Sequence, residues 1–215
     1  MKSWITKRPA LRLLAGEEKE GSEDGILVRT GAMALSASDA GYLPENIFYL
    51  SPFDTGVSLV ADRCRFVAGS LEDLRFLDQE ADRAGIKGIC KVGLRLQAPG
   101  FARVKDVVMP DELVRYAREI KLLRHLTVRG CFFTADLTDV HGAELGRFFR
   151  AGYETAKRMT VTLPCAMPYL CFENAVAAIN ENAAHHPETL DDCLRALDIM
   201  IMQNETAFYA KLYMS

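Results

Sequence analysis

The sequence lacks any apolar run long enough to cross a membrane, and it lacks a strong excess of one charge. Its 26 basic and 29 acidic residues are mixed along the chain and leave a net charge of −3. Without a basic patch, neither nucleic acid nor an anionic membrane is an expected partner. The amino terminus also has no apolar segment followed by a cleavage site. We therefore expect a cytoplasmic protein whose partner is a small molecule.

Paired-cysteine motifs and glycine-rich nucleotide motifs are absent as well. The chain has six cysteines, but none forms a C-x-x-C pair, and several lie within apolar runs. Buried free thiols are therefore expected, rather than disulfides or a metal centre. No G-x-G-x-x-G follows an early apolar run, which argues against an open dinucleotide-binding sheet.

What the sequence does have is a regular alternation of short β-branched or aromatic runs with amphipathic stretches. Hydrophobic residues make up 49% of its 215 residues, enough for a sizeable core. Near-continuous apolar character in several runs is typical of strands buried on both faces of a parallel sheet. The pattern predicts an α/β fold, a single-domain (β/α)8 TIM-type barrel over residues 1–215. The expected strands are 3–6, 25–30, 46–51, 65–69, 88–96, 126–133, 168–172 and 205–214.

Barrel enzymes place their chemistry at the carboxyl ends of the strands, so residues that follow the expected strands are candidates for a site. Lys7 directly follows the first expected strand. The irregular segment 98–110 follows the fifth, and it is a candidate active-site loop.

Several segments resemble, in the same order, the type III pyridoxal-phosphate (PLP) enzymes, the family of alanine racemase and of the ornithine and diaminopimelate decarboxylases. WITKRPALRLLAG is similar to the family's opening around V-K-A-N-P, and LTVRGCFFTADLTD is similar to the racemases' L-x-G-x-x-T-H-F-A-T-A-D. YLCFENAVAAI resembles H-x-A-N-S-A-A, and NETAFYAKLY resembles the closing R-P-G-I-A-L-Y-G. With two further segments, 31–52 and 66–96, these pieces cover most of the chain. The resemblance implies an alanine racemase-like barrel that binds PLP and acts on an amino acid.

The resemblance also implies particular residues for the cofactor. Lys7 would form the Schiff base with PLP and serve as the catalytic base of a racemase-like enzyme. Asn174, Ala175 and Val176 open a helix after the seventh expected strand, where barrel enzymes often bind a phosphate. Thr206 matches the family's last-strand glycine and is the second expected phosphate contact.

Two further positions are expected to face the cofactor or substrate. The resemblance places Asn204 or Glu205 opposite the ring nitrogen of PLP, with Glu205 as the acid that would keep it protonated. Arg95 is a candidate for binding the substrate carboxylate or the phenolate of PLP. For Lys91, as for Arg95, the competing interpretation is an internal ion pair with Asp136, because buried cations need partners.

The resemblance has gaps, and they keep three hypotheses open. Leu11 stands where the family has a tyrosine, a phenylalanine replaces the histidine of T-H-F, and the family's C-terminal β-domain has no counterpart. The chain is therefore a PLP-dependent racemase-like enzyme, a PLP-binding homeostasis or carrier protein, or a barrel subunit without PLP that needs a separately encoded partner domain. Because no helix is expected after the last strand, we also expect apolar surface to be buried in a homodimer or against that partner domain.

Overall fold

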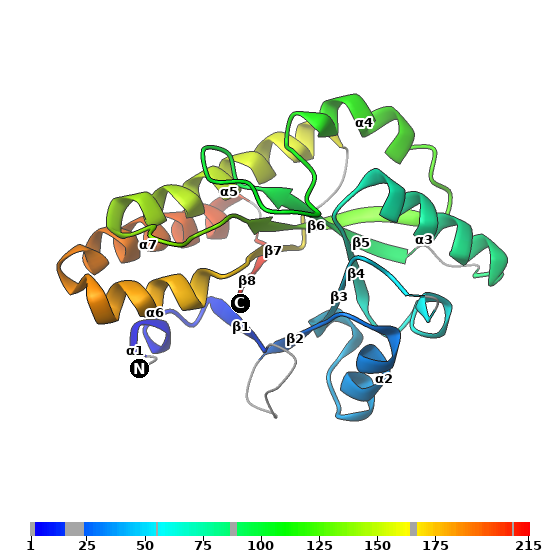
Figure 1. Cartoon of the computed structure of the whole chain (residues 1–215), viewed down its shortest axis with the longest axis horizontal. Coiled ribbons are helices and arrows are strands. Elements are labelled where there is room, and N and C mark those ends of the chain that lie inside the picture. The colour runs from blue at the N-terminus through cyan, green and yellow to red at the C-terminus, as the bar shows by residue number, and fades with distance from the viewer. Residues whose placement is uncertain (1–2, 16–23, 55, 87–89, 164–166, 208) are drawn as a thin grey trace.

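The computed structural model describes residues 3–15, 24–54, 56–86, 90–163, 167–207 and 209–215. Its strands pair in parallel, each with the next in chain order, and the last pairs with the first to close a barrel. Figure 1 shows this closure, with the first strand in blue beside the last in red. The predicted α/β barrel of the TIM type is therefore confirmed. The strands are β1 (Leu11–Ala15), β2 (Gly25–Val28), β3 (Ile47–Leu50), β4 (Arg65–Ala68), β5 (Cys90–Gln97), β6 (Leu126–Thr134), β7 (Tyr169–Phe172) and β8 (Lys211–Met214).

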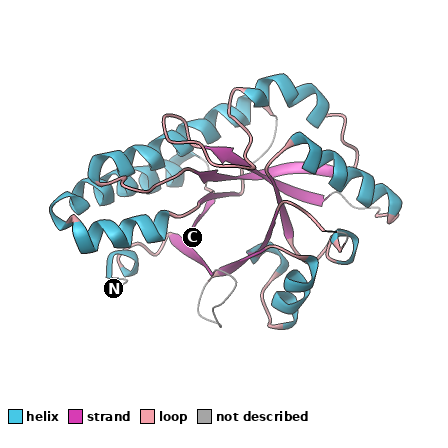
Figure 2. Cartoon of the chain, viewed as in Figure 1, coloured by secondary structure: helices cyan, strands magenta, loops and turns pink. Residues whose placement is uncertain are grey.

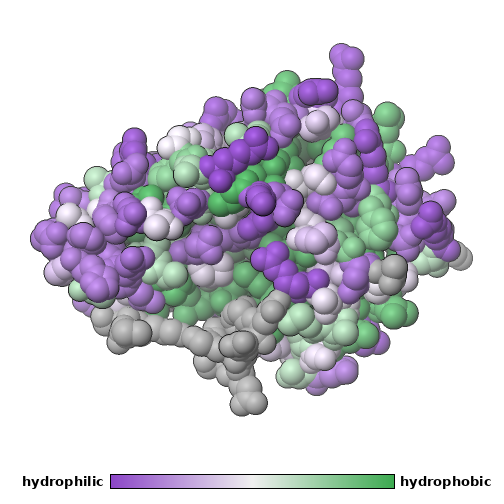
Figure 3. Space-filling view, in the orientation of Figure 1, coloured by the Kyte–Doolittle hydropathy of each residue, from purple (hydrophilic) through white to green (hydrophobic). Residues whose placement is uncertain are grey.

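Helices surround the barrel and cover its outer face (Figure 2). Their buried residues recur every three or four positions, as in α3, where Leu71, Leu74 and Leu77 pack inward. On the face shown in Figure 3, hydrophilic side chains dominate the outer surface over the helices at the left. No helix in the described ranges is long and apolar enough to span a bilayer. The helices are α1 (Ser3–Thr6), α2 (Gly31–Asp39), α3 (Leu71–Arg83), α4 (Glu112–Ile120), α5 (Gly142–Thr162), α6 (Ala175–His185) and α7 (Leu190–Ala207), with short 3-10 turns at Pro44–Asn46, Val57–Leu59 and Pro187–Thr189.

The first expected strand was wrong. Residues 3–6 form the short helix α1, and the first strand, β1, begins only at Leu11. A four-residue apolar run is compatible with either a strand or a helix. Contacts with residues far away in the sequence therefore determine which of the two it forms. The indole N–H of Trp4 donates to Asn180 Oδ1 of α6 at 3.1 Å, and Arg8 binds the carboxylate of Asp198 in α7 at 2.7 Å. These contacts hold the segment against the outside of the barrel.

The last expected strand began too early. The prediction started it at residue 205, whereas α7 continues to Ala207 and β8 starts at Lys211. The side-chain amide of Asn204 holds this junction, because it donates to the carbonyl of Ala210 at 2.9 Å and accepts from the amide of the same residue at 3.3 Å. The two hydrogen bonds between the Asn204 side chain and the Ala210 backbone therefore mark the turn between α7 and β8.

Four aromatic rings fill the middle of the barrel, and we call them the aromatic plug. The centroid of Phe48 lies 5.2 Å from that of Phe132, 5.2 Å from that of Tyr169 and 5.1 Å from that of Tyr213. All four residues are buried. The ring of Tyr169 occupies the space where a side chain at Gly130 would lie. The glycine on β6 is therefore required for the plug to fit.

We predict that Gly130→Ala lowers the free energy of unfolding by about 1 to 3 kcal/mol, because the new methyl group overlaps the Tyr169 ring. Urea denaturation followed by circular dichroism measures this change. In a Tyr169→Leu background the same substitution should cost far less, since the overlapping ring is gone. Equal costs in the two backgrounds would contradict this account of the plug.

Candidate functional site

An ion pair spans the carboxyl end of the barrel. Arg95 of β5 donates through Nε and Nη2 to the carboxylate of Glu173, which follows β7 directly, at 2.8 to 3.0 Å. The two side chains are only 14% and 6% exposed. Arg95 Nη1 also lies 3.4 Å from the carbonyls of Lys105 and Asp106. The expected internal pair with Asp136 is therefore wrong, and Glu173 is the partner of Arg95.

The start of α2, which also lies at this end, is occupied by a carboxylate from within the chain. The carboxylate of Asp54 accepts from the amide of Gly31 at the start of α2, at 3.0 Å, and from that of Gly56 at 2.9 Å. Burial alone would raise the pKa of Asp54, but hydrogen bonding with Tyr49 and with these two amides outweighs burial and lowers it. The Asp54 carboxylate thus acts as a built-in anion at this helix start.

The segment expected to bind phosphate does begin a helix after β7, as predicted. Asn174 is the N-cap of α6 and has a left-handed backbone with φ of 62°, but its side chain makes no capping hydrogen bond. Ala175 is fully buried, and the amide of Val176 donates to the carbonyl of Ser215 at 3.1 Å. Asn174 lines a pocket at this end of the barrel.

The structure separates Lys7, Glu205 and Thr206 from this end of the barrel. Lys7 is exposed in the turn that precedes β1, so it does not follow a strand as expected. Glu205 and Thr206 are exposed in the last turn of α7, before the amino end of β8, and the Thr206 hydroxyl donates back to the helix carbonyls of Met202 and Gln203. These three residues therefore do not meet Arg95 or Asn174 in one site.

Lysine placement decides how well PLP fits. Lys91 is the second residue of β5 and is at the amino end of the barrel, whereas Asp136 follows the carboxyl end of β6, so the alternative pair of these two is also wrong. Among the lysines that the structure describes, Lys105 alone lies in a loop directly after a strand, and it is exposed. A Schiff-base site needs a lysine amine in the barrel mouth. The residues described here do not fit PLP in that position.

A pocket does lie at the carboxyl rim, between β6, the loop 98–110 and α6, and we call it the rim pocket. Its volume is about 370 Å³, and its polar lining residues are Arg103, Asp136, Thr138, Asn174 and Glu181. The loop reaches this position because Ala102 forms a bridge with Asp136, whose amide donates to the Ala102 carbonyl at 3.3 Å. The structure thus brings the expected active-site loop to the pocket.

The rim pocket carries both signs of charge. Arg103 supplies one guanidinium, while Asp136 and Glu181 supply two carboxylates, and all three residues are exposed. Hydrogen bonding to Thr138 lowers the pKa of Asp136, whose Oδ1 accepts from the Thr138 amide at 3.0 Å. A ligand with one anionic and one cationic group complements this lining.

Sequence reasoning missed Glu173, Arg103 and Glu181. Glu173 adjoins the predicted strand end at 172 and could have been found from that position alone. Arg103 lies within the segment that was already singled out as a loop. Glu181 gives no local signal, because it becomes a pocket residue only through the placement of α6.

Solved structures share this fold at low sequence identity. The arginine decarboxylase of Paramecium bursaria Chlorella virus superposes with a TM-score of 0.69 at 12% identity, over 100% of this chain and 59% of that one. Alanine racemase of Clostridium difficile 630 gives 0.61 at 14% identity, over 98% and 55%. PipY of Synechococcus elongatus, determined without PLP, gives 0.63 at 12% identity, over 98% and 93%. This chain thus spans a little over half of the decarboxylase and the racemase, and nearly all of PipY.

These likenesses show that this chain has the same barrel fold as those proteins. No family model matches the sequence, and no curated protein matches it significantly. The likenesses extend to the fold alone.

We predict that Glu173→Gln lowers the free energy of unfolding by about 3 kcal/mol, because it leaves the Arg95 guanidinium buried without its counter-charge. Urea denaturation is the measurement. Glu144→Gln is the matched control, since it removes an exposed carboxylate paired with Arg147 and should cost less than about 0.5 kcal/mol. Similar costs for both variants would show that the pair at the carboxyl end contributes no more than a surface one.

Proposed function

We propose that the chain is a small-molecule-binding barrel and that its ligand is an amino acid or a similar zwitterion, bound in the rim pocket. The observation that carries this proposal is the presence of both charge signs in one pocket. Arg103 would bind the ligand carboxylate, for which a guanidinium is well suited, and Asp136 and Glu181 would bind its ammonium group. The volume of about 370 Å³ is within the range of small-molecule sites.

PLP-dependent racemisation at Lys7 is a weaker candidate. That activity requires a lysine close to the substrate-binding groups, whereas Lys7 is exposed on the turn before β1. Glu205, expected at the ring nitrogen, is in the last turn of α7. The proposal therefore assigns no catalytic step to Lys7.

A PLP-holding protein without turnover is the second candidate, and one observation favours it. The match to PipY extends over 98% of this chain and 93% of that one, so the two have nearly the same architecture. Arg95 and the Val176 amide, however, would have to leave Glu173 and Ser215 before they could bind a phosphate. We propose further that self-association, or a separately encoded partner domain, covers apolar surface of the barrel.

We predict that isothermal titration with single L-amino acids finds at least one that binds, and that Arg103→Gln weakens this binding about tenfold, because one charge-assisted contact is lost. Asp136→Asn should weaken it comparably. Arg147→Gln, an exposed arginine on α5, is the control and should leave the dissociation constant within about twofold. Binding that is unaffected by both pocket variants would overturn the rim pocket as the site.

We predict that equimolar PLP followed by borohydride leaves no adduct on Lys7, as read by peptide mass spectrometry, and that Lys7→Ala binds the amino acid as the wild type does. The reason is the exposed position of Lys7 outside the barrel mouth. An adduct on Lys7, with a visible absorbance band that Lys7→Ala abolishes, would restore the racemase hypothesis. An adduct on another lysine would instead support the PLP-holding function.

A further inference from the structure

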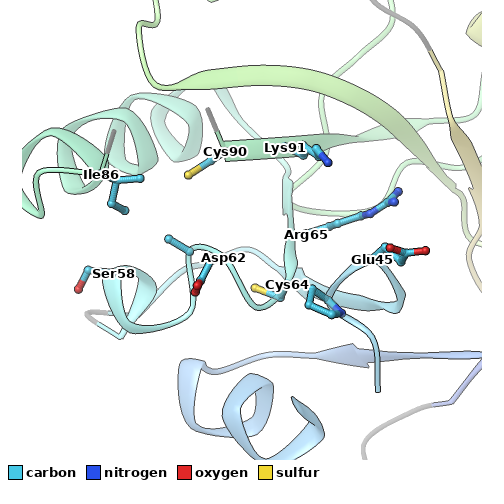
Figure 4. Close-up of a pocket in the computed structure, with 10 residues that line it drawn as sticks. Glu45, Ser58, Asp62, Cys64, Arg65, Ile86, Cys90 and Lys91 are labelled. Atoms are coloured by element: carbon cyan, nitrogen blue, oxygen red, sulfur yellow. The ribbon is translucent and has the colours of Figure 1, made fainter. Parts of the chain in front are cut away.

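A second pocket lies at the amino end of the barrel, opposite the rim pocket. It has a volume of about 520 Å³ and is lined by residues before and at the start of β3, β4 and β5. Glu45, Arg65 and Lys91 provide charged groups, and Figure 4 shows their side chains extending toward the same side. Cys64, Cys90 and Ile86 line another part of the pocket. We call it the amino-end pocket.

Arg65 and Lys91 are neighbours on adjacent strands. Phe66 of β4 pairs with Val92 of β5, and Arg65 and Lys91 each come one residue earlier. Phe66 and Val92 pack on the outer face of the sheet, so the alternation of side chains along a strand places Arg65 and Lys91 on the inner face. Like charges directly opposite each other on neighbouring strands repel and destabilise the sheet. Within the described ranges, neither cation has a carboxylate within ion-pair distance. An anion bound between Arg65 and Lys91 would relieve their mutual repulsion.

The guanidinium of Arg65 is held in place by the aromatic plug. Its carbon lies 4.6 Å from the ring centroid of Tyr169 and 5.9 Å from that of Phe48. Stacking on aromatic faces favours an arginine and fixes its plane, which leaves the fork available for a bidentate contact. Arg65 Nη1 is buried and has no hydrogen-bond partner in the described structure. The rings therefore hold the guanidinium in place, with one of its donors unsatisfied inside the barrel.

The carboxylates near this pocket do not cancel its positive charge. Glu45 binds Lys211, with Nζ 3.2 Å from Oε1, so one acid faces three cations at this mouth. Asp62 also lines the pocket, but in Figure 4 it extends on the opposite side from Arg65 and Lys91. The end of the pocket near Arg65 therefore carries a positive excess.

We propose that the amino-end pocket is a binding site for a small organic anion, with a phosphate or carboxylate group bound between Arg65 and Lys91. Arg65 donates two parallel hydrogen bonds to the anion, and Lys91 adds a point charge from the neighbouring strand. The wall formed by Cys64, Cys90 and Ile86 contacts the apolar part of the ligand. This site is independent of the rim pocket, and its ligand does not need an ammonium group.

The test uses the full chain labelled with ¹⁵N and titrated with inorganic phosphate at constant ionic strength. We expect saturable amide shifts at Arg65 and Lys91, and a dissociation constant that rises about tenfold in Lys91→Gln. Arg65→Lys keeps the charge but loses the fork, so it should also weaken binding. Lys157→Gln, which removes an exposed lysine on α5, is the control and should leave binding within about twofold.

A parallel titration with succinate distinguishes the two chemistries. Tighter binding of phosphate assigns the pocket to phosphorylated ligands, and tighter binding of succinate assigns it to carboxylates. Lys91→Gln should also raise the thermal midpoint without ligand, because it removes the repulsion from Arg65. The proposal is overturned if neither anion gives saturable shifts up to about 50 mM, or if Lys91→Gln and Lys157→Gln have equal effects.

Discussion

Packing around Phe48 is the constraint on which the rest of this barrel depends. Its ring contacts aromatic side chains from β6, β7 and β8, so one residue joins opposite walls of the closed sheet. Most of the strands are four or five residues long and could not hold a barrel by hydrogen bonds alone. Aromatic rings fill the centre of the barrel, and the rim pocket and a second pocket lie at its opposite ends.

The two ends of the barrel stabilise their buried arginines in different ways. At the carboxyl end, Arg95 is paired with an acid from the same chain and its donors are satisfied. At the amino end, Arg65 is stabilised by aromatic faces and one of its donors stays without a partner. Aromatic stacking lowers the cost of burying a guanidinium but does not neutralise it. The fold is shared with solved decarboxylase and racemase structures, and within the described ranges its two ends differ in whether their buried arginine has a charged partner.

Much of the architecture could be predicted because strands buried on both faces appear in the sequence as short apolar runs. The runs at 46–51 and 126–133 became β3 and β6 almost as expected. The first run failed because Trp4 is held by Asn180, a contact across most of the chain that no local pattern contains. The site was harder to predict for the same reason. Arg95 and Glu173 are far apart in sequence and meet only when the barrel closes, and the family resemblance aligned Lys7 with a strand that does not form there.

The Arg95 and Glu173 pair has a consequence for how this protein could respond to its surroundings. Glu173 is tethered beside the guanidinium, so its effective concentration there is at least of the order of millimolar. An external anion competes with that tethered acid and gains access to Arg95 only when it is abundant or makes further contacts. The pair thus raises the concentration at which an external anion would occupy Arg95, compared with an arginine that has no internal partner.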